Sequence, residues 1–128
     1  MQKEWIEEYC KDNSRKGKTV LHFNFIIGNK CRLDCTMEYR IRHKLRSRYY
    51  TDKGTMYIRN LKTYKKHRMK GYATRLLKFA INKSIKKGLY IIELDDMSDN
   101  FRKQHNIYVK HGFGYVSDHG PEMIKKLY

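Results

Sequence analysis

A basic loop with a single glycine is the stretch of this sequence with the clearest chemical meaning. It reads Arg68-Met69-Lys70-Gly71-Tyr72-Ala73 and leads into a helix-like segment. Backbone N–H groups at a helix N-terminus have no intrahelical partner, and the helix dipole adds partial positive charge, so an anion is stabilised there. Gly71 lets the backbone approach a phosphate closely, and Ala73 keeps the first turn free of bulk. The loop therefore predicts a phosphate site, unless it is only a turn.

The segments around this loop must position it. Residues 56–61 read as a strand, and residues 72–88 as an amphipathic helix that ends at Gly88. Its apolar face holds Ala73, Leu76, Leu77, Ala80, Ile81, Ser84 and Ile85. Residues 89–94 have the composition of a buried strand, and after an acidic turn a second helix runs into residues 108–113. The pattern therefore predicts a strand, loop, helix, strand and helix in succession.

This order resembles the GNAT superfamily of acetyl-CoA-dependent N-acetyltransferases. The resemblance rests on the R-x-x-G-x-A loop and on a Tyr-x-x-x-Gly-Phe motif at Tyr108, Gly112 and Phe113. It covers about residues 55–128, which would form the cofactor-binding half of one domain spanning residues 1–128. The implied fold is α/β (α+β), with a mixed, largely antiparallel sheet, a V-shaped strand split and flanking helices.

The resemblance also implies how the co-substrate acetyl-CoA would bind. Its pyrophosphate would lie on the backbone N–H groups of residues 69–73, with added charge from Arg68 and Lys70 and a hydroxyl contact from Thr74. Its pantetheine arm would pair like an extra strand between residues 56–61 and 89–94.

In the family motif, the position of Tyr108 belongs to the tyrosine that reaches the cofactor sulfur. A tyrosine with a pKa near 10 can protonate a departing thiolate whose pKa is somewhat lower. Tyr108 is therefore the predicted general acid. The alternative is a core aromatic residue that packs with Phe101.

Residues 94–100 resemble the L-E-x-x-x-x-N segment of ribosomal-protein N-terminal acetyltransferases, whose glutamate is thought to deprotonate the amine. Alignment on Asn100 places Asp95 at that glutamate. The spacing to Tyr108 is one residue longer than usual, so Asp96 is an alternative, as are Glu93 and water alone. Asp99 is expected to cap the following helix.

The composition limits the class of protein. The chain has 128 residues, a net charge of +16 and three cysteines, with no candidate membrane span or signal peptide. An odd number of cysteines suits a reducing compartment, so a cytoplasmic location is expected. Cys31 and Cys35 lack the second ligand pair of a zinc site, and we expect two thiols near a turn and no metal. No cysteine has the setting of a nucleophile.

The N-terminal half departs from the family, whose members generally start with a strand and two helices that help to form the acceptor site. Here residues 2–12 suggest one short amphipathic helix that presents Trp5, Ile6, Tyr9 and Cys10 on one face. Residues 21–27 and 37–42 alternate as strands. Arg40, Arg42, Lys44, Arg46 and Arg48 would continue as a basic stripe beside Tyr49 and Tyr50. This stripe is either a solvated strand face or a nucleic-acid surface.

The predicted activity is direct transfer of an acetyl group from acetyl-CoA to a primary amine in a ternary complex. Residues 14–71 carry 17 of the 29 basic side chains and only three of the 13 acidic ones. Such a field favours a protein or tRNA- or ribosome-associated acceptor over a small cationic amine, although it is equally compatible with a solvated surface. Rival interpretations are a catalytically inactive module that binds CoA or nucleic acid, and a nucleic-acid-binding protein in which the loop is only a turn. Residues 114–127 predict a closing hairpin whose edge allows a homodimer.

Overall fold

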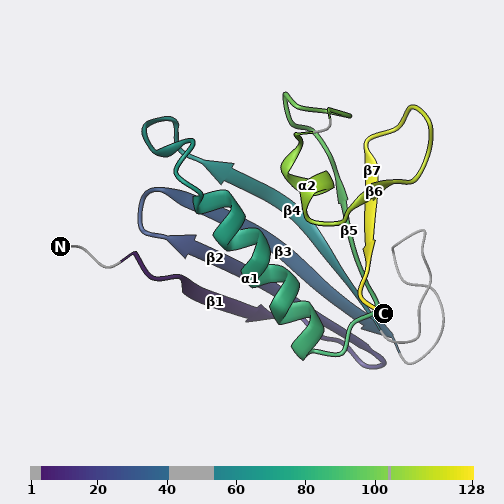
Figure 1. Ribbon diagram of the computed structural model, residues 1–128. Helices are drawn as coiled ribbons and strands as arrows, with labels where there is room; N and C mark the ends of the chain where they lie inside the picture. The colour runs from purple at the N-terminus through teal and green to yellow at the C-terminus, as the bar shows by residue number, and fades with distance from the viewer. Residues whose placement is uncertain (1–3, 41–53, 104) are drawn as a thin grey trace.

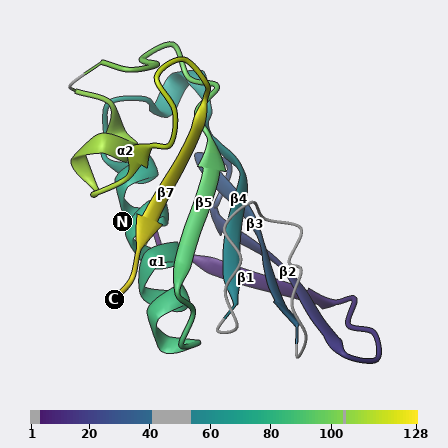
Figure 2. The same cartoon turned by 90° about the vertical axis from the view of Figure 1, so that its right-hand side faces the viewer.

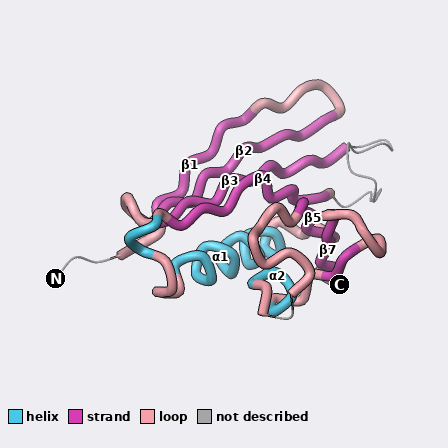
Figure 3. Tube along the Cα trace, turned by 90° about the horizontal axis from the view of Figure 1, so that it is seen from above, coloured by secondary structure: helices cyan, strands magenta, loops and turns pink. Residues whose placement is uncertain are grey.

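The computed structural model describes residues 4–40, 54–103 and 105–128, and these residues form one sheet of seven strands with helices on one face (Figures 1 and 3). In chain order the elements are β1 (Glu7–Asp12), β2 (Lys18–Ile27), β3 (Cys31–Arg40), β4 (Thr55–Thr63), the 3-10 helix η1 (Lys65–His67), α1 (Tyr72–Lys86), β5 (Ile91–Asp95), α2 (Ile107–Lys110), β6 (Gly114–Tyr115) and β7 (Glu122–Lys126). The strand order is β1-β2-β3-β4-β5-β7-β6. Only β4 and β5 are parallel among these neighbours. The predicted mixed, largely antiparallel fold is confirmed.

The core lies between α1 and the sheet. Phe23, Phe25 and Ile27 occupy alternate positions of β2 and are buried against α1, as expected for a strand with one apolar face. The predicted helix starts at Tyr72 and buries Leu76 and the side chains that follow at helical spacing. Ile85 was expected on this face, but it is 54% exposed. At about 100° per residue, nine residues after Leu76 is the opposite side of the helix.

The predicted N-terminal helix is wrong, because residues 7–12 form strand β1 (Figure 1). Each of its six residues has a register partner on β2. A short isolated helix is marginal in water, whereas the open edge of β2 offers a ladder of hydrogen bonds to every second residue. Trp5, Tyr9 and Cys10 are consequently exposed, and only Ile6 packs against the core.

The strand that generally begins the family is therefore present, but the two helices expected after it are not. Among the described residues, β1 passes directly into β2 through a turn at residues 13–17, which Arg15 and Lys18 close by pairing their backbones. Gly17 has a φ of 77°, which suits this tight turn. The face of the sheet opposite α1 thus has no helical cover from this segment.

The strand predicted at residues 37–42 begins earlier, at Cys31, immediately after the turn at residues 28–30. Cys31 and Cys35 face the core and are fully buried. Burial raises the pKa of Cys35 to about 12, so its thiol stays protonated at neutral pH. The basic stripe from Arg42 to Arg48, with Tyr49 and Tyr50, lies outside the described residues and stays a prediction.

The second predicted helix is shorter than expected, since α2 spans one turn. Asp99 does not cap it. Asn106 is the N-cap, and its side chain accepts hydrogen bonds from the backbone N–H of Tyr108 at 2.7 Å and of Val109 at 3.4 Å. The closing hairpin is present as β6 and β7, and β7 lies alongside β5 (Figure 2). Within the described part of the chain, no helix has the length and apolar character needed to cross a membrane.

Candidate active site

The N-terminus of α1 presents backbone N–H groups to solvent. Gly71, the N-cap, has a φ of 82°, and no side chain of the described residues caps the helix. The first intrahelical hydrogen bond at this end runs from the N–H of Arg75 to the carbonyl of Gly71 at 3.1 Å. The N–H groups of Tyr72, Ala73 and Thr74 precede it and form the unpaired first turn. The helix thus starts where the loop sequence predicted, and the anion site at this end stays a prediction.

The side chains of the loop differ in whether they are exposed to solvent or bonded within the protein. Lys70 and Met69 are exposed, and Arg68 donates from Nε to the carbonyl of Thr63 at 3.4 Å. The ring of Tyr72 turns inward, where its hydroxyl donates to Glu4 at 2.7 Å. That hydrogen bond raises the pKa of Tyr72. Tyr72 can therefore offer an anion its backbone N–H but not its hydroxyl.

Strands β4 and β5 pair only along part of their length. Their register runs from Thr55 opposite Ile91 to Ile58 opposite Leu94, after which β4 continues to Thr63 without a β5 partner among the described residues. Figure 1 shows the two strands diverging toward their carboxyl ends. Backbone groups on this side of β4 are then free of sheet pairing, as an extended ligand that adds to a strand requires.

A β-bulge marks the same point of β4. On β3, Asp34 pairs with Asn60 whereas the next residue, Cys35, pairs with Ile58, so Arg59 is left without a partner. Bulges bend a strand and re-aim a side chain, and they are common beside active sites. The bulge and the end of the β4–β5 pairing coincide, which places Arg59 at the apex of the split.

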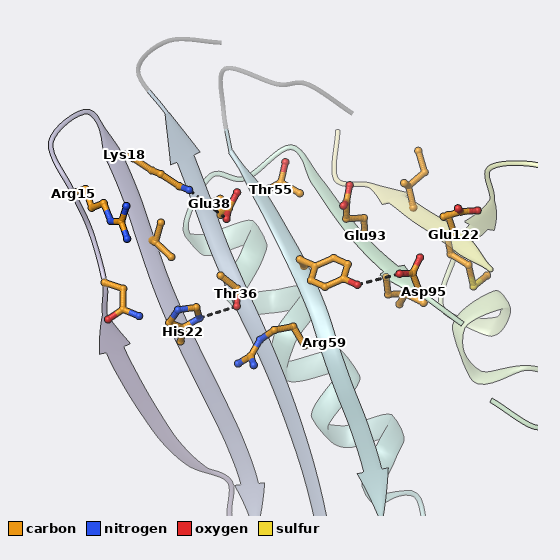
Figure 4. A pocket seen from close by; sticks show the side chains of 16 residues that line it. Arg15, Lys18, His22, Thr36, Glu38, Thr55, Arg59, Glu93, Asp95 and Glu122 are labelled. Carbon is orange, nitrogen blue, oxygen red and sulfur yellow. Dashed lines mark hydrogen bonds and ion pairs between the residues drawn. The ribbon is translucent and has the colours of Figure 1, made fainter. Parts of the chain in front are cut away.

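A cleft of about 590 Å³ lies over the sheet at this apex (Figure 4). Its lining comes from alternate positions of β2, β3 and β4, from three consecutive residues each of β5 and β7, and from the β1–β2 turn. The lining residues are Asn13, Arg15, Lys18, Val20, His22, Thr36, Glu38, Thr55, Tyr57, Arg59, Glu93, Leu94, Asp95, Glu122, Met123 and Ile124. Residues from both halves of the chain therefore build one cleft.

Asp95 is the only residue of the predicted site that lines this cleft. Its Oδ2 accepts a hydrogen bond from the hydroxyl of Tyr57 at 3.1 Å (Figure 4). Glu93, one of the alternatives, lines the same cleft two residues earlier on β5. Strand alternation thus brings two of the three candidate carboxylates to one face of the sheet.

Asp96, the other alternative, is directed away from the cleft and is only 2% exposed. Its carboxylate accepts hydrogen bonds from Ser98 Oγ at 2.5 Å, Asn106 Nδ2 at 2.8 Å and the hydroxyl of Tyr115 at 2.5 Å. These donors hold the segment between β5 and α2 together. The geometry gives Asp96 a structural task, and of the three predicted candidates only Asp95 and Glu93 line the cleft.

Tyr108 lies on α2, on the side of the sheet that carries α1, and does not line the cleft (Figure 3). Its ring is half-buried, with the ring of Phe113 edge-on at 6.0 Å. Burial, followed by the charge of Asp96, raises the pKa of Tyr108 to about 12. The phenol therefore stays protonated at neutral pH.

Sequence reasoning missed most of the cleft lining, including His22, which contacts Thr36 at 2.8 Å. The sequence signal for these residues was the polar side chain at every second position of each strand. A single strand does not show which polar side chains of other strands will lie beside its own. No group of three His, Cys, Asp or Glu side chains in the described parts of the chain is arranged to hold a metal ion.

Comparisons with known proteins agree with this geometry. The sequence model described as the Acetyltransferase (GNAT) family matches residues 36–113. A search of curated proteins gives no match. Among solved structures, a GNAT family acetyltransferase from Elizabethkingia anophelis with acetyl-CoA bound is 13% identical and has a TM-score of 0.56, with 95% of this chain and 98% of that chain covered.

Two further solved structures share the fold. A putative N-acetyltransferase from Lactobacillus plantarum is 18% identical over 85% of this chain and 70% of that chain, with a TM-score of 0.55. A chain of the NatC complex bound to Gag peptide and CoA is 21% identical over 85% of this chain and 71% of that chain, with a TM-score of 0.56. At these identities the likeness concerns the fold, and it agrees with the family match over more than half of the sequence. The chain belongs to the GNAT family of acetyltransferases.

Proposed function

We propose that this protein transfers an acetyl group from acetyl-CoA to a primary amine by direct transfer in a ternary complex. The observation that carries the proposal is the coincidence at one point of the sheet of the β4–β5 split, the bulge at Arg59 and a cleft that contains Asp95. Family membership supports the reaction class. The buried, protonated thiols of Cys31 and Cys35 favour direct transfer over a cysteine-bound intermediate.

The α1 N-terminus fits the pyrophosphate of acetyl-CoA. No described atom lies within 4 Å of the place that a Cβ of Gly71 would take, so a phosphate has room beside the backbone. The N–H groups of residues 72–74 would hold it, with charge from Arg68 and Lys70. The unpaired edge of β4 after Ile58 suits an extended pantetheine arm, which would direct the thioester toward the apex of the split.

On the cleft side, we assign the amine to the neighbourhood of Asp95. An ammonium group must lose a proton before it attacks a thioester, and a carboxylate in hydrogen-bond reach can take that proton directly or through water. The hydroxyl of Tyr57 holds Asp95 in a fixed orientation at 3.1 Å. Glu93 remains the alternative base, and an amine that arrives neutral needs only water.

On the opposite side of the sheet, Tyr108 would protonate the departing thiolate. With its pKa raised to about 12, the phenol is protonated at neutral pH and can donate a hydrogen bond to the developing thiolate, although it is a weaker acid than an ordinary tyrosine. Tyr108 and Asp95 lie on opposite faces of the sheet, so acid and base would act on the thioester from its two sides. This arrangement gives the proton that leaves the amine and the proton that reaches the sulfur separate routes.

For the acceptor, we favour an amine on a nucleic-acid-associated molecule, because the net charge of +16 attracts polyanions. The test is release of free CoA thiol from acetyl-CoA, measured with aminoacyl-RNA, basic proteins and small amines. Amine-dependent thiol release supports the proposal. Stabilisation by CoA without any thiol release would instead indicate a binding module, and salt-sensitive nucleic-acid binding without stabilisation by CoA would indicate a nucleic-acid-binding protein.

A further inference from the structure

Most of the charged side chains of the cleft fall into two groups, apart from Glu38, which forms an ion pair with Lys18 at 3.8 Å. We call Glu93, Asp95 and Glu122, on β5 and β7, the acidic wall; Arg15, Lys18 and Arg59, on the β1–β2 turn, β2 and β4, form the basic wall (Figure 4). The acidic wall is continuous because Asp95 and Glu122 are register partners. Arg59 lies on β4, next to β5, whereas β2 is three strand spacings from β5, or about 14 Å, so only a ligand larger than a single ion reaches from the acidic wall to Lys18.

A buried hydroxyl between the walls has no partner. Thr55 is 3% exposed, lines the cleft, and its Oγ1 makes no hydrogen bond with any described residue. Figure 4 shows Thr55 between Glu38 and Glu93. A buried hydroxyl without a hydrogen-bond partner destabilises the fold, so such groups usually bind water or a ligand. The cleft therefore has a polar contact that the protein alone does not use.

Resting on the proposed function, we propose that this cleft accepts a dipolar acceptor, in which a primary amine is carried close to a phosphate of a nucleic acid. The amine lies beside the acidic wall near Asp95, a phosphate meets the basic wall, and Thr55 binds a polar atom of the linking group. A nucleic acid that bears an aminoacyl group has this chemistry.

The surroundings of the cleft favour a nucleic acid over an acidic peptide as the carrier of the negative charge. Lys11 and Lys16 are exposed on the β1–β2 hairpin, next to Arg15 of the basic wall and to one exposed acidic side chain, Asp12. They extend the positive surface beyond the cleft, where a chain of phosphates continues past the reacting end. A small cationic amine has no negative charge to offer Arg15 and Arg59 of the basic wall, whereas a phosphate does.

The experiment compares three acceptors that carry the same aminoacyl group. They are a short RNA hairpin with the group at its 3′ end, the same group esterified to adenosine without phosphate, and a peptide with the same N-terminal residue followed by two aspartates. We expect kcat/KM for the RNA to exceed that for the adenosine ester by 10- to 100-fold at low salt, and the difference to shrink as salt rises.

Arg15→Glu should lower the ratio of kcat/KM for the RNA to kcat/KM for the adenosine ester at least tenfold. Lys86→Glu changes the net charge equally at an exposed position of α1, on the other side of the sheet, and should leave the ratio unaltered. Thr55→Val, which keeps the shape but removes the hydroxyl, should raise KM for the RNA about fivefold without lowering the melting temperature. A purely structural hydroxyl would change the melting temperature and leave KM as it was.

Each other outcome contradicts a specific statement. Equal kcat/KM for the three acceptors would refute the dipolar acceptor while leaving acetyl transfer intact. A preference for the acidic peptide would refute the nucleic acid as carrier. Absence of thiol release with every acceptor would refute the proposed function itself, and with it the assignment of the cleft.

Discussion

The two faces of the sheet differ in the kind of side chain that they present. Toward α1 the strands present apolar side chains such as Phe25 and Leu33, which are fully buried, and the ligand groups on that side are backbone N–H groups at the helix N-terminus. On the opposite face the same strands present His22, Thr36 and Glu38, and the chemistry depends on side chains. The proposed pyrophosphate site on the α1 side therefore depends mainly on the course of the main chain, whereas the proposed chemistry of the cleft depends on the identity of each side chain.

The largest expected effect tests the backbone N–H groups at the N-terminus of α1. Gly71→Asp should weaken CoA binding by more than 1,000-fold, because it places a carboxylate beside the first-turn N–H groups where the pyrophosphate must lie. The protein itself leaves room for a Cβ there, so the loss would come from charge and from the φ of 82°, not from a clash within the chain. Isothermal titration with CoA measures it.

Gly88→Asp is the matched control for that substitution. Gly88 has a φ of 72° and equally open surroundings, but it follows the C-terminal end of α1. The Gly88→Asp substitution imposes a similar backbone strain but puts no negative charge at the phosphate site, so CoA affinity should stay near that of the unaltered protein. Equal loss of affinity in both variants would contradict the assigned pyrophosphate site.

The second-largest expected effect tests the face of the sheet that carries the cleft. Asp95→Asn should lower kcat/KM for the amine about 100-fold, as loss of a general base does, while CoA affinity is preserved. The acetylation rate at saturating acetyl-CoA measures it. If Glu93→Gln gives the larger loss, the base is Glu93.

Asp96→Asn tests whether the carboxylate next to Asp95 stabilises the fold or takes part in catalysis. Because Asp96 is buried and accepts from Ser98, Asn106 and Tyr115, the substitution should lower the free energy of unfolding by about 2–3 kcal/mol. Urea denaturation measures this loss. Unaltered stability together with a fall in kcat as large as that of Asp95→Asn would reverse the assignment of the two residues.

The smallest effect concerns Tyr108. Tyr108→Phe should lower kcat about tenfold with CoA affinity nearly intact, because a water molecule can replace the phenol as proton donor less effectively. Steady-state kinetics with an amine acceptor measures the change. Turnover equal to that of the unaltered protein would remove Tyr108 from the mechanism.

The raised pKa of Tyr108 also has a consequence for stability. The folded state keeps this proton up to a pKa of about 12, whereas an unfolded tyrosine releases it near pH 10. Its contribution to stability is therefore complete below about pH 10 and disappears as the pH rises toward 12. Thermal unfolding of Tyr108→Phe should show a weaker loss of stability over this interval than the unaltered protein.

The contrast between the faces also explains what sequence could predict. The loop before Tyr72, the apolar stripe of α1 and the alternation of β2 are local patterns, and each gave the right element. The hairpin β1–β2 was missed because the pattern of residues 2–12 fits a helix as well as an edge strand, and only the free edge of β2 decides between them.

The cleft lining could not be predicted from local patterns. Arg15, Thr55 and Glu122 are far apart in sequence, and they come together only through a strand order in which β7 lies between β5 and β6. The choice between Asp95 and Asp96 likewise depended on the register of β5, because a shift of one residue exchanges the two faces of a strand.

The short β1–β2 turn has a final consequence for how water reaches the reaction. Among the described residues, the connection from β1 to β2 supplies no helix to cover the amine side, so this connection does not keep water from Asp95. A docked acceptor would supply the cover that this connection does not. A bulky acceptor would shield the thioester as it docks and a small one would not, and idle hydrolysis of acetyl-CoA should decline as the acceptor surface is occupied.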